Sequence, residues 1–592
     1  MITCVINGKR AIPSLRGEIK LTKENPFVKS GGSYTYDVQF PMDIPENVMA
    51  LGPMHRQDVS KRSGTFDECE LYAGNLLLIR GRGTVTRVSE SEVRLQIVSS
   101  AATSKFSEEF ANVYIDNITY REVAAKYRET PVAVGDELNS KLFVGEEGLY
   151  VFQPTRVAGK VNSGPAATEA YVNMIARKEG AGLCLYHPSV QPSLLYVVRR
   201  VLECMGYAAD LSAYDKKPWN MLYIANATRT LDMAKALPHW TAGTLLDEFR
   251  KLFNAVFIFD GEHKTVRVVP FSESENGEVE QVEPVEEFES NYDDDGIEYL
   301  GASNVAYSLS GNHRADASIS MQVLKRYPVI SIVEWTRRHD SMSERERMTT
   351  FVDMGNLGLG YLERQDDGTE MLREAGVFRP LFRSLESDTT VELKMAPVAL
   401  TDPRDEFQFF TFGPSIDGVG SFGDHVTTKY VVLPILDEKP ERTGDGYVSI
   451  SEAINGEDPE GEEKEESETI ELMFATSQYV CNTGSDTLHV PDLPKACTDY
   501  CLYNRNGQIA SLSLNKRSGI YDSIGNLHDT AKSVDGNKEL CFKFLYDGIP
   551  DPTKRYIIRN KLYLCSKIEA GITNEEGIDR LKTGYFYEIL DQ

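Results

Sequence analysis

The sequence lacks several features that would place it in familiar classes of protein. No apolar run approaches the ~20 residues that a membrane-spanning helix requires. The stretch 1–10 also lacks the charged-then-apolar order of a signal peptide, so we expect a start in the cytoplasm without a secretion signal. Basic residues are few, with 63 Lys and Arg against 90 Asp and Glu and a net charge of −27. Because nucleic-acid phosphates are held by Lys and Arg clusters, this balance disfavours a protein that grips nucleic acid.

Cysteine is scarce, and its number is odd. Nine cysteines are scattered over 592 residues, which excludes a disulfide framework. Cys497 and Cys501 lie four positions apart, with Cys481 and His489 upstream, and zinc ligands can have this spacing. No second closely spaced pair follows to complete such a site. We therefore expect reduced core cysteines and no metal site.

Catalytic signatures are also missing. The sequence contains neither His-Glu-x-x-His nor a phosphate-binding Gly-x-x-x-x-Gly-Lys-Ser/Thr loop. The stretch 413–417 has a serine after Gly-x but lacks the second glycine of a nucleophile elbow, and the glycines at 355, 358 and 360 have the wrong order for a dinucleotide loop. We expect no catalytic or cofactor-binding residues and therefore no enzyme. A pair of catalytic carboxylates cannot be located among 90 acidic residues, so a cell-wall or polysaccharide-degrading enzyme stays an alternative.

An acidic stretch over 273–296 raises the question of calcium. Positions one, three, five and six of a calcium-binding loop would be Asn291, Asp293, Asp295 and Gly296. Position twelve must be a bidentate Glu, but it is Ala302. The pattern therefore favours a solvated acidic loop or linker, with no metal ion.

The residues that are present favour β structure. Tyr and Phe (29 and 25) far outnumber Trp (3), and aromatic residues are enriched in strands. Tyr34, Tyr36, Val38 and Phe40 alternate with polar residues, which predicts a strand over 34–40 with one buried face. Similar patterns predict strands over 18–22, 76–79, 83–88 and 93–98. We interpret residues 1–118 as an N-terminal β-barrel.

The middle of the chain has the periodicity of helices. Leu194, Leu195, Val198, Val201, Leu202 and Met205 form one apolar stripe that predicts a helix beginning at Pro192 and ending at Gly206. The same pattern predicts a helix over 244–253, capped by Thr241 or Thr244, before a hairpin of strands at 255–259 and 265–269. A further helix is predicted from 165 towards 176. Residues 119–275 are predicted to be an α/β domain.

The remainder of the chain returns to β patterns. We predict a second β-rich, barrel-like domain over 276–450, an acidic linker over 451–468 and a C-terminal β-rich domain over 469–592. Within the last domain, strands 556–558 and 562–568 are predicted to form a hairpin around Arg559 and Asn560. The fold class is thus mainly β with α/β insertions, in which two barrel-like domains flank a helix-hairpin middle.

Several runs resemble a known family. They are Asn25-Pro26-Phe27, the run 33–43 (Ser-Tyr-Thr-Tyr-Asp-Val-Gln-Phe-Pro-Met-Asp), Pro45-Glu46-Asn47, and the strands 83–88 and 93–98. Together they resemble the N-terminal barrel of bacteriophage tail baseplate hub proteins, most of all those from phages and prophages of gut Bacteroidetes. The helix-hairpin middle is similar to modules that lie between the barrels of these hubs.

The resemblance implies a structural role. It implies a homotrimer that joins the hexameric tail tube to the tip, with two barrels per subunit offering six similar faces to the tube. The partners would be the tube protein and other baseplate or tail-tip proteins, and the location would be the virion tail. Viral DNA would pass through the ring without being bound, and the acidic composition suits such a conduit. A receptor-binding tail protein or adhesin stays an alternative, although no repeat of fixed period is visible.

Overall fold

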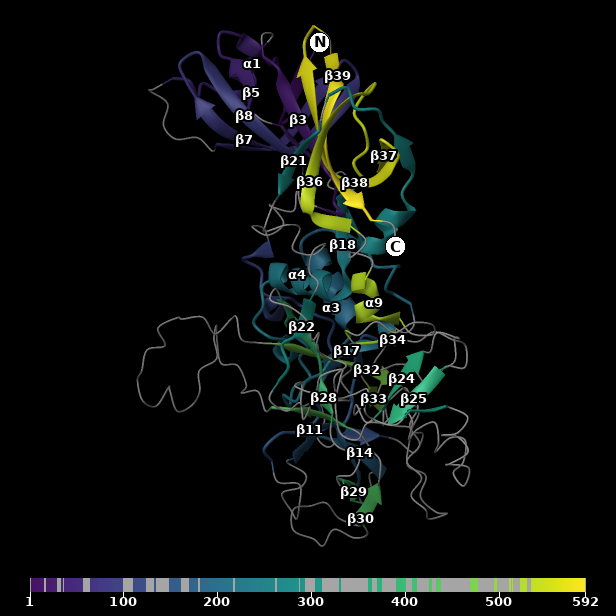
Figure 1. Ribbon diagram of the computed structural model, residues 1–592. Helices are drawn as coiled ribbons and strands as arrows, with labels where there is room; N and C mark the ends of the chain where they lie inside the picture. The colour runs from purple at the N-terminus through teal and green to yellow at the C-terminus, as the bar shows by residue number, and fades with distance from the viewer. Residues whose placement is uncertain are drawn as a thin grey trace, which may run out of the picture.

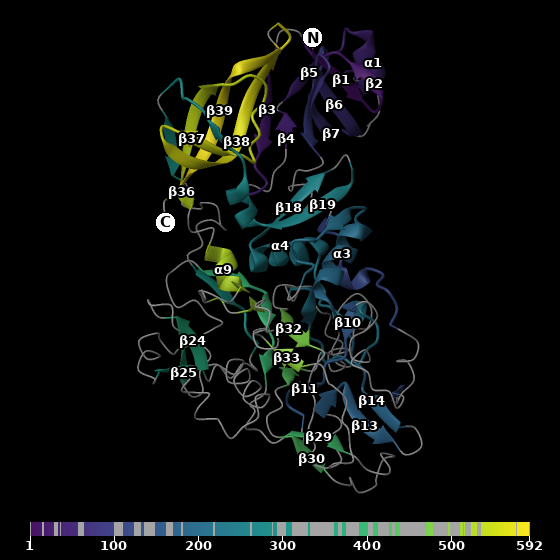
Figure 2. The ribbon, with the colours of Figure 1, turned by 90° about the vertical axis from the view of Figure 1, so that its right-hand side faces the viewer.

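The protein is mainly β and contains several sheets. The computed structural model describes residues 2–99, 110–123, 148–160, 170–292 and 534–590 with short gaps, strand 132–134, and short separate segments between 304 and 529. In Figures 1 and 2, strands from the two ends of the chain lie side by side at one end of the molecule, above a middle part that contains the longer helices.

The N-terminal unit consists of strands β1 to β8 and helix α1, and its core is mainly aliphatic. The bounds are β1 Ile2–Ile6, β2 Lys9–Ala11, β3 Ile19–Glu24, β4 Ser33–Thr35, β5 Val38–Pro41, α1 Pro45–Leu51, β6 Thr65–Ala73, β7 Leu76–Val88 and β8 Glu92–Ser99. Alternate residues of β1 and β8, such as Ile6 and Leu95, are completely buried, as expected for strands with one buried face. The two expected strands at 76–79 and 83–88 form one continuous strand, β7.

The expected strand over 34–40 is two shorter strands, β4 and β5. Thr35 is buried where the alternation predicted Tyr34. The Thr35 hydroxyl accepts a hydrogen bond from the Ile97 backbone N–H at 3.0 Å and so takes the place of a ladder contact with β8. The prediction was wrong because the Thr35 side chain forms a hydrogen bond with the backbone of β8, and this bond allows a polar residue to lie on the buried face.

The C-terminal unit combines the last strands of the chain with a segment from its middle. Its strands are β20 Val279–Gln281, β21 Glu289–Tyr292, β36 Val534–Leu545, β37 Arg555–Ile558, β38 Lys561–Thr573 and β39 Gly577–Ile589. The predicted hairpin is confirmed: Arg559 and Asn560 have φ angles of 49° and 63°, the left-handed conformation that a tight two-residue turn requires. The core of this unit is rich in aromatic rings, with Phe586 in contact with Phe542, Phe544, Tyr556 and Tyr563.

The two units share one sheet. Its strand order is β2-β1-β6-β7-β8-β4-β3-β38-β39-β36-β21, so β3 and β38 join the units by antiparallel pairing, from Ile19 opposite Ile572 to Glu24 opposite Lys567. Strand β38 pairs with β39 along its length and with β37 and then β3 on its other side. Among the described strands, the ladders form no closed barrel, so the predicted barrels are not confirmed.

The middle part contains two helices beside a small sheet. Helix α3 (Leu194–Cys204) begins two residues after the predicted start, and Gly206 follows it with a φ of 83°. Helix α4 (Ala242–Phe253) begins after Thr241, whose hydroxyl accepts the Thr244 N–H at 3.0 Å. The predicted apolar faces of both helices are buried. The adjoining strands are β16 Ala208–Asp210, β17 Leu222–Ile224, β18 Ala255–Asp260 and β19 Thr265–Pro270.

Residues from distant parts of the sequence complete the middle part. Strand β17 pairs with β32 (Ile470–Thr476), which also pairs with β27 (Met395–Pro397). The short helix α9 (Ile524–Asp529) is tied to α4, because the Asn254 side chain donates a hydrogen bond to the Leu527 carbonyl at 3.0 Å. The helix predicted from 165 towards 176 is wrong in its described residues, which form β12 (Tyr171–Val172) and the start of β13 (Met174–Lys178).

The other described elements are short. They are η1 Ile115–Asn117, β9 Val132–Val134, β10 Tyr150–Val151, β11 Thr155–Val157, β14 Gly182–Tyr186, β15 Gln191–Pro192, η6 Trp219–Met221, η7 Ala234–Ala236, η8 Phe271–Asn276, β22 Asn304–Tyr307, β23 Val329–Ser331, β24 Gly360–Arg364, β25 Glu370–Glu374, β26 Thr390–Leu393, β28 Ala399–Leu400, β29 Phe407–Thr411, β30 His425–Thr428, β31 Pro434–Leu436, β33 Lys495–Cys497, β34 Ala510–Ser511 and β35 Asp522–Ser523.

The predicted domain boundaries stay predictions. Much of 276–450, where a second barrel was predicted, and all of the linker 451–468 lie outside the described residues. The β unit that adjoins the N-terminal unit is instead built from 279–292 and 534–589. Within the described part of the chain, no helix is long and apolar enough to cross a membrane.

Candidate functional site

The cysteines that the structure describes are mostly core residues. Cys4, Cys69 and Cys565 are completely buried. Burial raises the pKa of the Cys4 thiol, with a further contribution from Cys69, and burial likewise raises the pKa of Cys565 well above its ordinary value. Such thiols stay protonated at neutral pH and pack as small apolar groups, because the thiolate is the nucleophilic form.

The residues considered for zinc and calcium are only partly described. Cys481, His489 and Cys501 lie outside the described residues, as do Asp293, Asp295, Gly296 and Ala302, while Cys497 is placed in β33 by its backbone. Asn291 lies in β21 opposite Glu539 of β36. Among the residues that the structure describes, no three His, Cys, Asp or Glu side chains are grouped to hold a metal ion. The stretch 413–417 is also outside the described residues.

One histidine and one carboxylate meet in the middle part. His239 Nδ1 lies 3.0 Å from Asp116 Oδ2, and the imidazole stacks on Tyr114 at 4.0 Å between ring centroids. The backbones of the same segments are also bonded, since the Ile115 N–H donates to the Trp240 carbonyl at 2.9 Å. The pair therefore fastens the segment around η1 to the segment that precedes α4, which is a structural task.

Asn25 extends the contact between the two sheet units at the end of the ladder of β3 and β38. Strand β38 has a bulge between Cys565 and Lys567, which leaves carbonyl groups without ladder partners. The Asn25 side chain donates to the Cys565 carbonyl at 2.7 Å, and its backbone N–H donates to the Ser566 carbonyl at 2.8 Å. Its side-chain oxygen accepts the Phe27 N–H at 3.0 Å. Asn25 is completely buried, so it fixes β3 against β38 where water cannot compete.

A separate apolar cluster, here called the three-way junction, lies next to Asn25. It joins all three parts of the molecule: Phe27 and Val28 from the N-terminal unit, Val256, Val269 and Phe271 from the middle, and Val534, Leu564 and Tyr587 from the C-terminal unit. Phe27 meets Phe271 edge to face at 6.4 Å. The run 25–28 therefore sets the position of both sheet units relative to the middle part, and we regard this junction as the candidate functional site.

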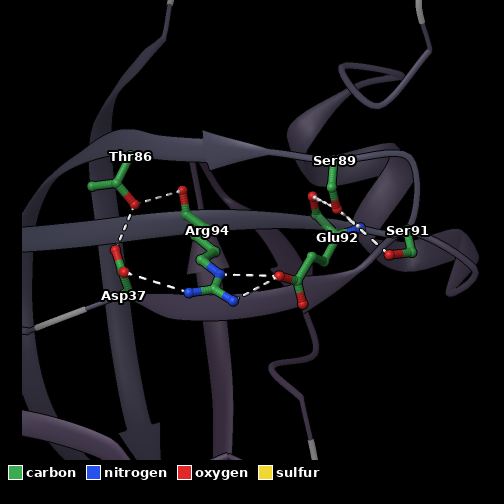
Figure 3. A network of polar contacts seen from close by, with 6 residues as sticks. All are labelled: Asp37, Thr86, Ser89, Ser91, Glu92 and Arg94. Atoms are coloured by element: carbon green, nitrogen blue, oxygen red, sulfur yellow. Dashed lines mark hydrogen bonds and ion pairs between the residues drawn. The ribbon is translucent and has the colours of Figure 1, made fainter.

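A polar network stiffens the outer face of the N-terminal unit (Figure 3). Arg94 of β8 is held by Glu92 at 3.0 Å and by Asp37 at 3.7 Å. Thr86 of β7 donates a hydrogen bond to Asp37 at 2.6 Å. Beyond it, the Ser89 hydroxyl accepts the Glu92 N–H at 3.1 Å and closes the turn between β7 and β8. These contacts fix the end of the β7–β8 hairpin.

The sequence gives no sign of the role of Asn25 and Phe27 in the junction. The run Asn25-Pro26-Phe27 contributes there only to a family resemblance, because the Cys565 carbonyl that Asn25 binds lies 540 positions away. An asparagine followed by proline and an aromatic residue signals a turn, and nothing in that signal identifies the bulge in β38. The expectation that catalytic, cofactor-binding and metal-binding residues are absent stays a prediction.

Two of the three comparisons with known proteins give no match. No family model matches the sequence, and no curated protein matches it. Among solved structures, the chain is similar to a tail protein from Neisseria meningitidis MC58, with 7% identity and a TM-score of 0.34 over 99% of this chain and 96% of that one. It is also similar to the 43 kDa tail protein of prophage MuSo2 from Shewanella oneidensis, with 6% identity and a TM-score of 0.31 over 99% and 97%. Both TM-scores are below 0.5, so neither likeness assigns a function to this chain.

Proposed function

We propose that this protein is the structural hub of a phage tail baseplate or tail tip, without catalytic activity. Three copies would form a ring that joins the hexameric tail tube to the threefold tip. The observation that carries the proposal is the pairing of β3 with β38, which holds two β units side by side in one chain. Three such chains present six β units, the number that a hexameric tube needs from a trimer.

The arrangement of the rest of the molecule supports this role. The three-way junction fixes both units at the same end of the middle part, so the six units of a trimer would share one level (Figures 1 and 2). The net charge of −27 favours a lumen that repels DNA weakly, so that DNA passes through without being held. The partners in the proposal are the tube protein and other tail-tip proteins, and the location is the virion tail.

The proposal is tested by mass photometry and negative-stain imaging of the full-length chain, alone and with the tube protein of the same phage or prophage. We expect particles that contain three copies of the 66.3 kDa chain and appear as rings with a central hole. A chain that stays monomeric even beside the tube protein would contradict the proposal. In that case, compact particles with a cleft would favour the polysaccharide-degrading alternative, which release of soluble sugars from purified cell walls would then test.

A further inference from the structure

The hydrophobic cores of the two sheet units meet on one face of β38. Ile572 belongs to the core of the N-terminal unit, whereas Ile568 belongs to the core of the C-terminal unit, and Ala570 lies between them. Antiparallel partners lie side by side on the same face of a sheet. Lys582 of β39 is the partner of Ala570, and Lys23 of β3 is the partner of Ile568. Both lysines therefore lie on this face, and we call Lys23, Ala570 and Lys582 the core seam.

Both lysines of the core seam are withdrawn from water, Lys582 completely and Lys23 in part. Among the residues that the structure describes, neither ammonium group has a hydrogen bond or an ion pair. Burial lowers the pKa of Lys23, and the charge of Asp551 offsets only part of this effect. Burial also lowers the pKa of Lys582, against the charges of Asp579 and Asp547. A buried cation without a partner disfavours the arrangement that encloses it.

The three carboxylates that act on these lysines are bonded to other groups. Asp551 Oδ1 accepts hydrogen bonds from the Thr553 N–H at 2.9 Å and from the Thr553 hydroxyl at 2.8 Å. Asp547 forms an ion pair with Arg580 at 2.8 Å. Asp579 accepts a backbone N–H of its own strand at 3.0 Å. The structure thus holds these carboxylates on partners other than the two lysines.

The segment 546–553 connects β36 to β37 and crosses the core seam. Tyr546 packs against the core of the C-terminal unit, and Ile549 packs against the core of the N-terminal unit. The side chain of Asp547 is 82% exposed. Gly548 has a φ of 88°, a conformation that glycine adopts without a steric penalty. The segment therefore covers the seam with its apolar side chains and keeps the charge of Asp547 outside.

We infer that segment 546–553 is a lid whose closure over the core seam is controlled by protonation of Lys23 and Lys582. The lid is closed in the structure and encloses both amines. A protonated amine favours an open lid, because water or a released carboxylate can then reach the ammonium group. Since each pKa is lowered in the closed form, this form binds fewer protons, and a rise in pH favours closure. The gain is complete above the ordinary lysine pKa of about 10.4 and is lost as the pH falls from there to the lowered value.

Thiol labelling of the lid tests this inference in the full-length chain. Ile549→Cys places a thiol on the inner side of the lid, in a Cys204→Ser background that removes an exposed native thiol. Peptide mass spectrometry gives the labelling rate at position 549. The rate is compared with and without Lys23→Met and Lys582→Met at each pH, so that the thiolate fraction cancels. At pH 7.5 we expect labelling about fivefold or more faster with both lysines present, and the ratio should fall towards one as the pH approaches 10.

The matched control is Lys20→Met, at an exposed lysine of the same strand β3, which should leave the labelling rate unchanged at every pH. Lys23→Met alone should give part of the effect, and it serves as the test if the double variant does not fold. A ratio of one at pH 7.5, or a ratio that does not change with pH, would overturn the inference. Chemical denaturation of the same chains gives a further check. A stability difference that changes with pH while labelling does not would assign the lysines to global unfolding and would also overturn the lid.

Discussion

The two sheet units have hydrophobic cores of different composition. The N-terminal unit is formed by 98 consecutive positions (2–99), has an aliphatic core and supplies partners for buried polar groups such as Thr35 and Asn47. The C-terminal unit is assembled from two distant segments around aromatic rings. It buries Lys582 completely, with no hydrogen-bond partner for its Nζ among the described residues, and β21 is the last strand in the described order of the sheet. Both units contain buried polar atoms without a hydrogen-bond partner among the described residues, such as Thr22 Oγ1 in the first and Ser566 Oγ in the second, so the difference between the units lies in their core side chains and in how each unit is assembled from the chain.

The aromatic core gives the largest expected effect. Phe586→Ala removes a completely buried ring that contacts four others and should lower the free energy of unfolding by about 3–5 kcal/mol. Because β38 belongs to both units, faster amide exchange should also reach β3. Phe288→Ala, at an exposed ring of the same unit, is the matched control and should have a small effect. Hydrogen exchange with mass spectrometry gives both readouts, and unchanged protection in β3 would show that the units unfold separately.

The second-largest effect is expected at Asn47 of α1, whose side chain binds the chain just after the outermost strand β2. Asn47 bonds both backbone groups of Ile12 and also donates to the Pro41 carbonyl at 2.8 Å. Asn47→Ala leaves these groups without partners and should lower the free energy of unfolding by about 2–4 kcal/mol. It should also make the chain prone to self-association through β2. Glu46→Ala, one position earlier and exposed, is the control. A melting temperature equal to that of the control would mean that the edge is closed in another way.

The buried lysine predicts a gain in stability. Burial lowers the pKa of Lys582, because the charged ammonium loses its hydration, and the charges of Asp579 and Asp547 offset only part of that effect. Lys582→Met keeps the volume and removes the unpaired charge, so the free energy of unfolding should rise by about 1–3 kcal/mol. Lys20→Met, at an exposed lysine of β3, should change little. The free energies of unfolding of the wild type, K582M and K20M are compared by chemical denaturation. A loss of stability in K582M would show that the lysine has a partner in solution.

The smallest effect is expected on the outer face of the N-terminal unit. Arg94 is partly exposed and paired with two carboxylates, so Arg94→Met should lower the free energy of unfolding by about 0.2–1 kcal/mol, and less at high salt. Lys20→Met, at an exposed lysine of β3 in the same unit, is the control and should change little. Thermal melts at 50 mM and 1 M salt give the comparison. An effect of Arg94→Met that is independent of salt would mean that packing of its stem, rather than charge, is lost.

The sequence predicted local structure far better than it predicted which segments meet. Periodicity located α3 and α4, and the pair Arg559 and Asn560 located a hairpin turn, because these depend on neighbours within a few positions. The partnership of β3 with β38 left no comparable sign. Alternation states that a strand has one buried face and is silent about the strand that will lie beside it, so the second β unit was expected in 276–450.

In the candidate site, too, the sequence does not reveal which residues meet. Phe27 and Phe271 each read as ordinary apolar residues at a strand end, and only the fold brings their rings together. Thr35 was taken for a solvent-facing residue because the alternation ignored the ability of its hydroxyl to replace a backbone partner. The charge of Arg87 is visible in the sequence, but its exposed position opposite Arg94 depends on the pairing of β7 with β8.

The shared strand β38 also determines when the protein can finish folding. A ribosome releases β3 early and β38 only after more than 530 further residues, because Ile19 pairs with Ile572. Throughout that interval the edge of β3 has no partner, and it is a place where a chaperone or a second nascent chain can bind. A chain that stops short, even by its last thirty or so residues, leaves this edge exposed permanently. Any assembly of this chain would thereby be protected from truncated subunits, since a chain acquires its paired units only after β38 has been synthesised.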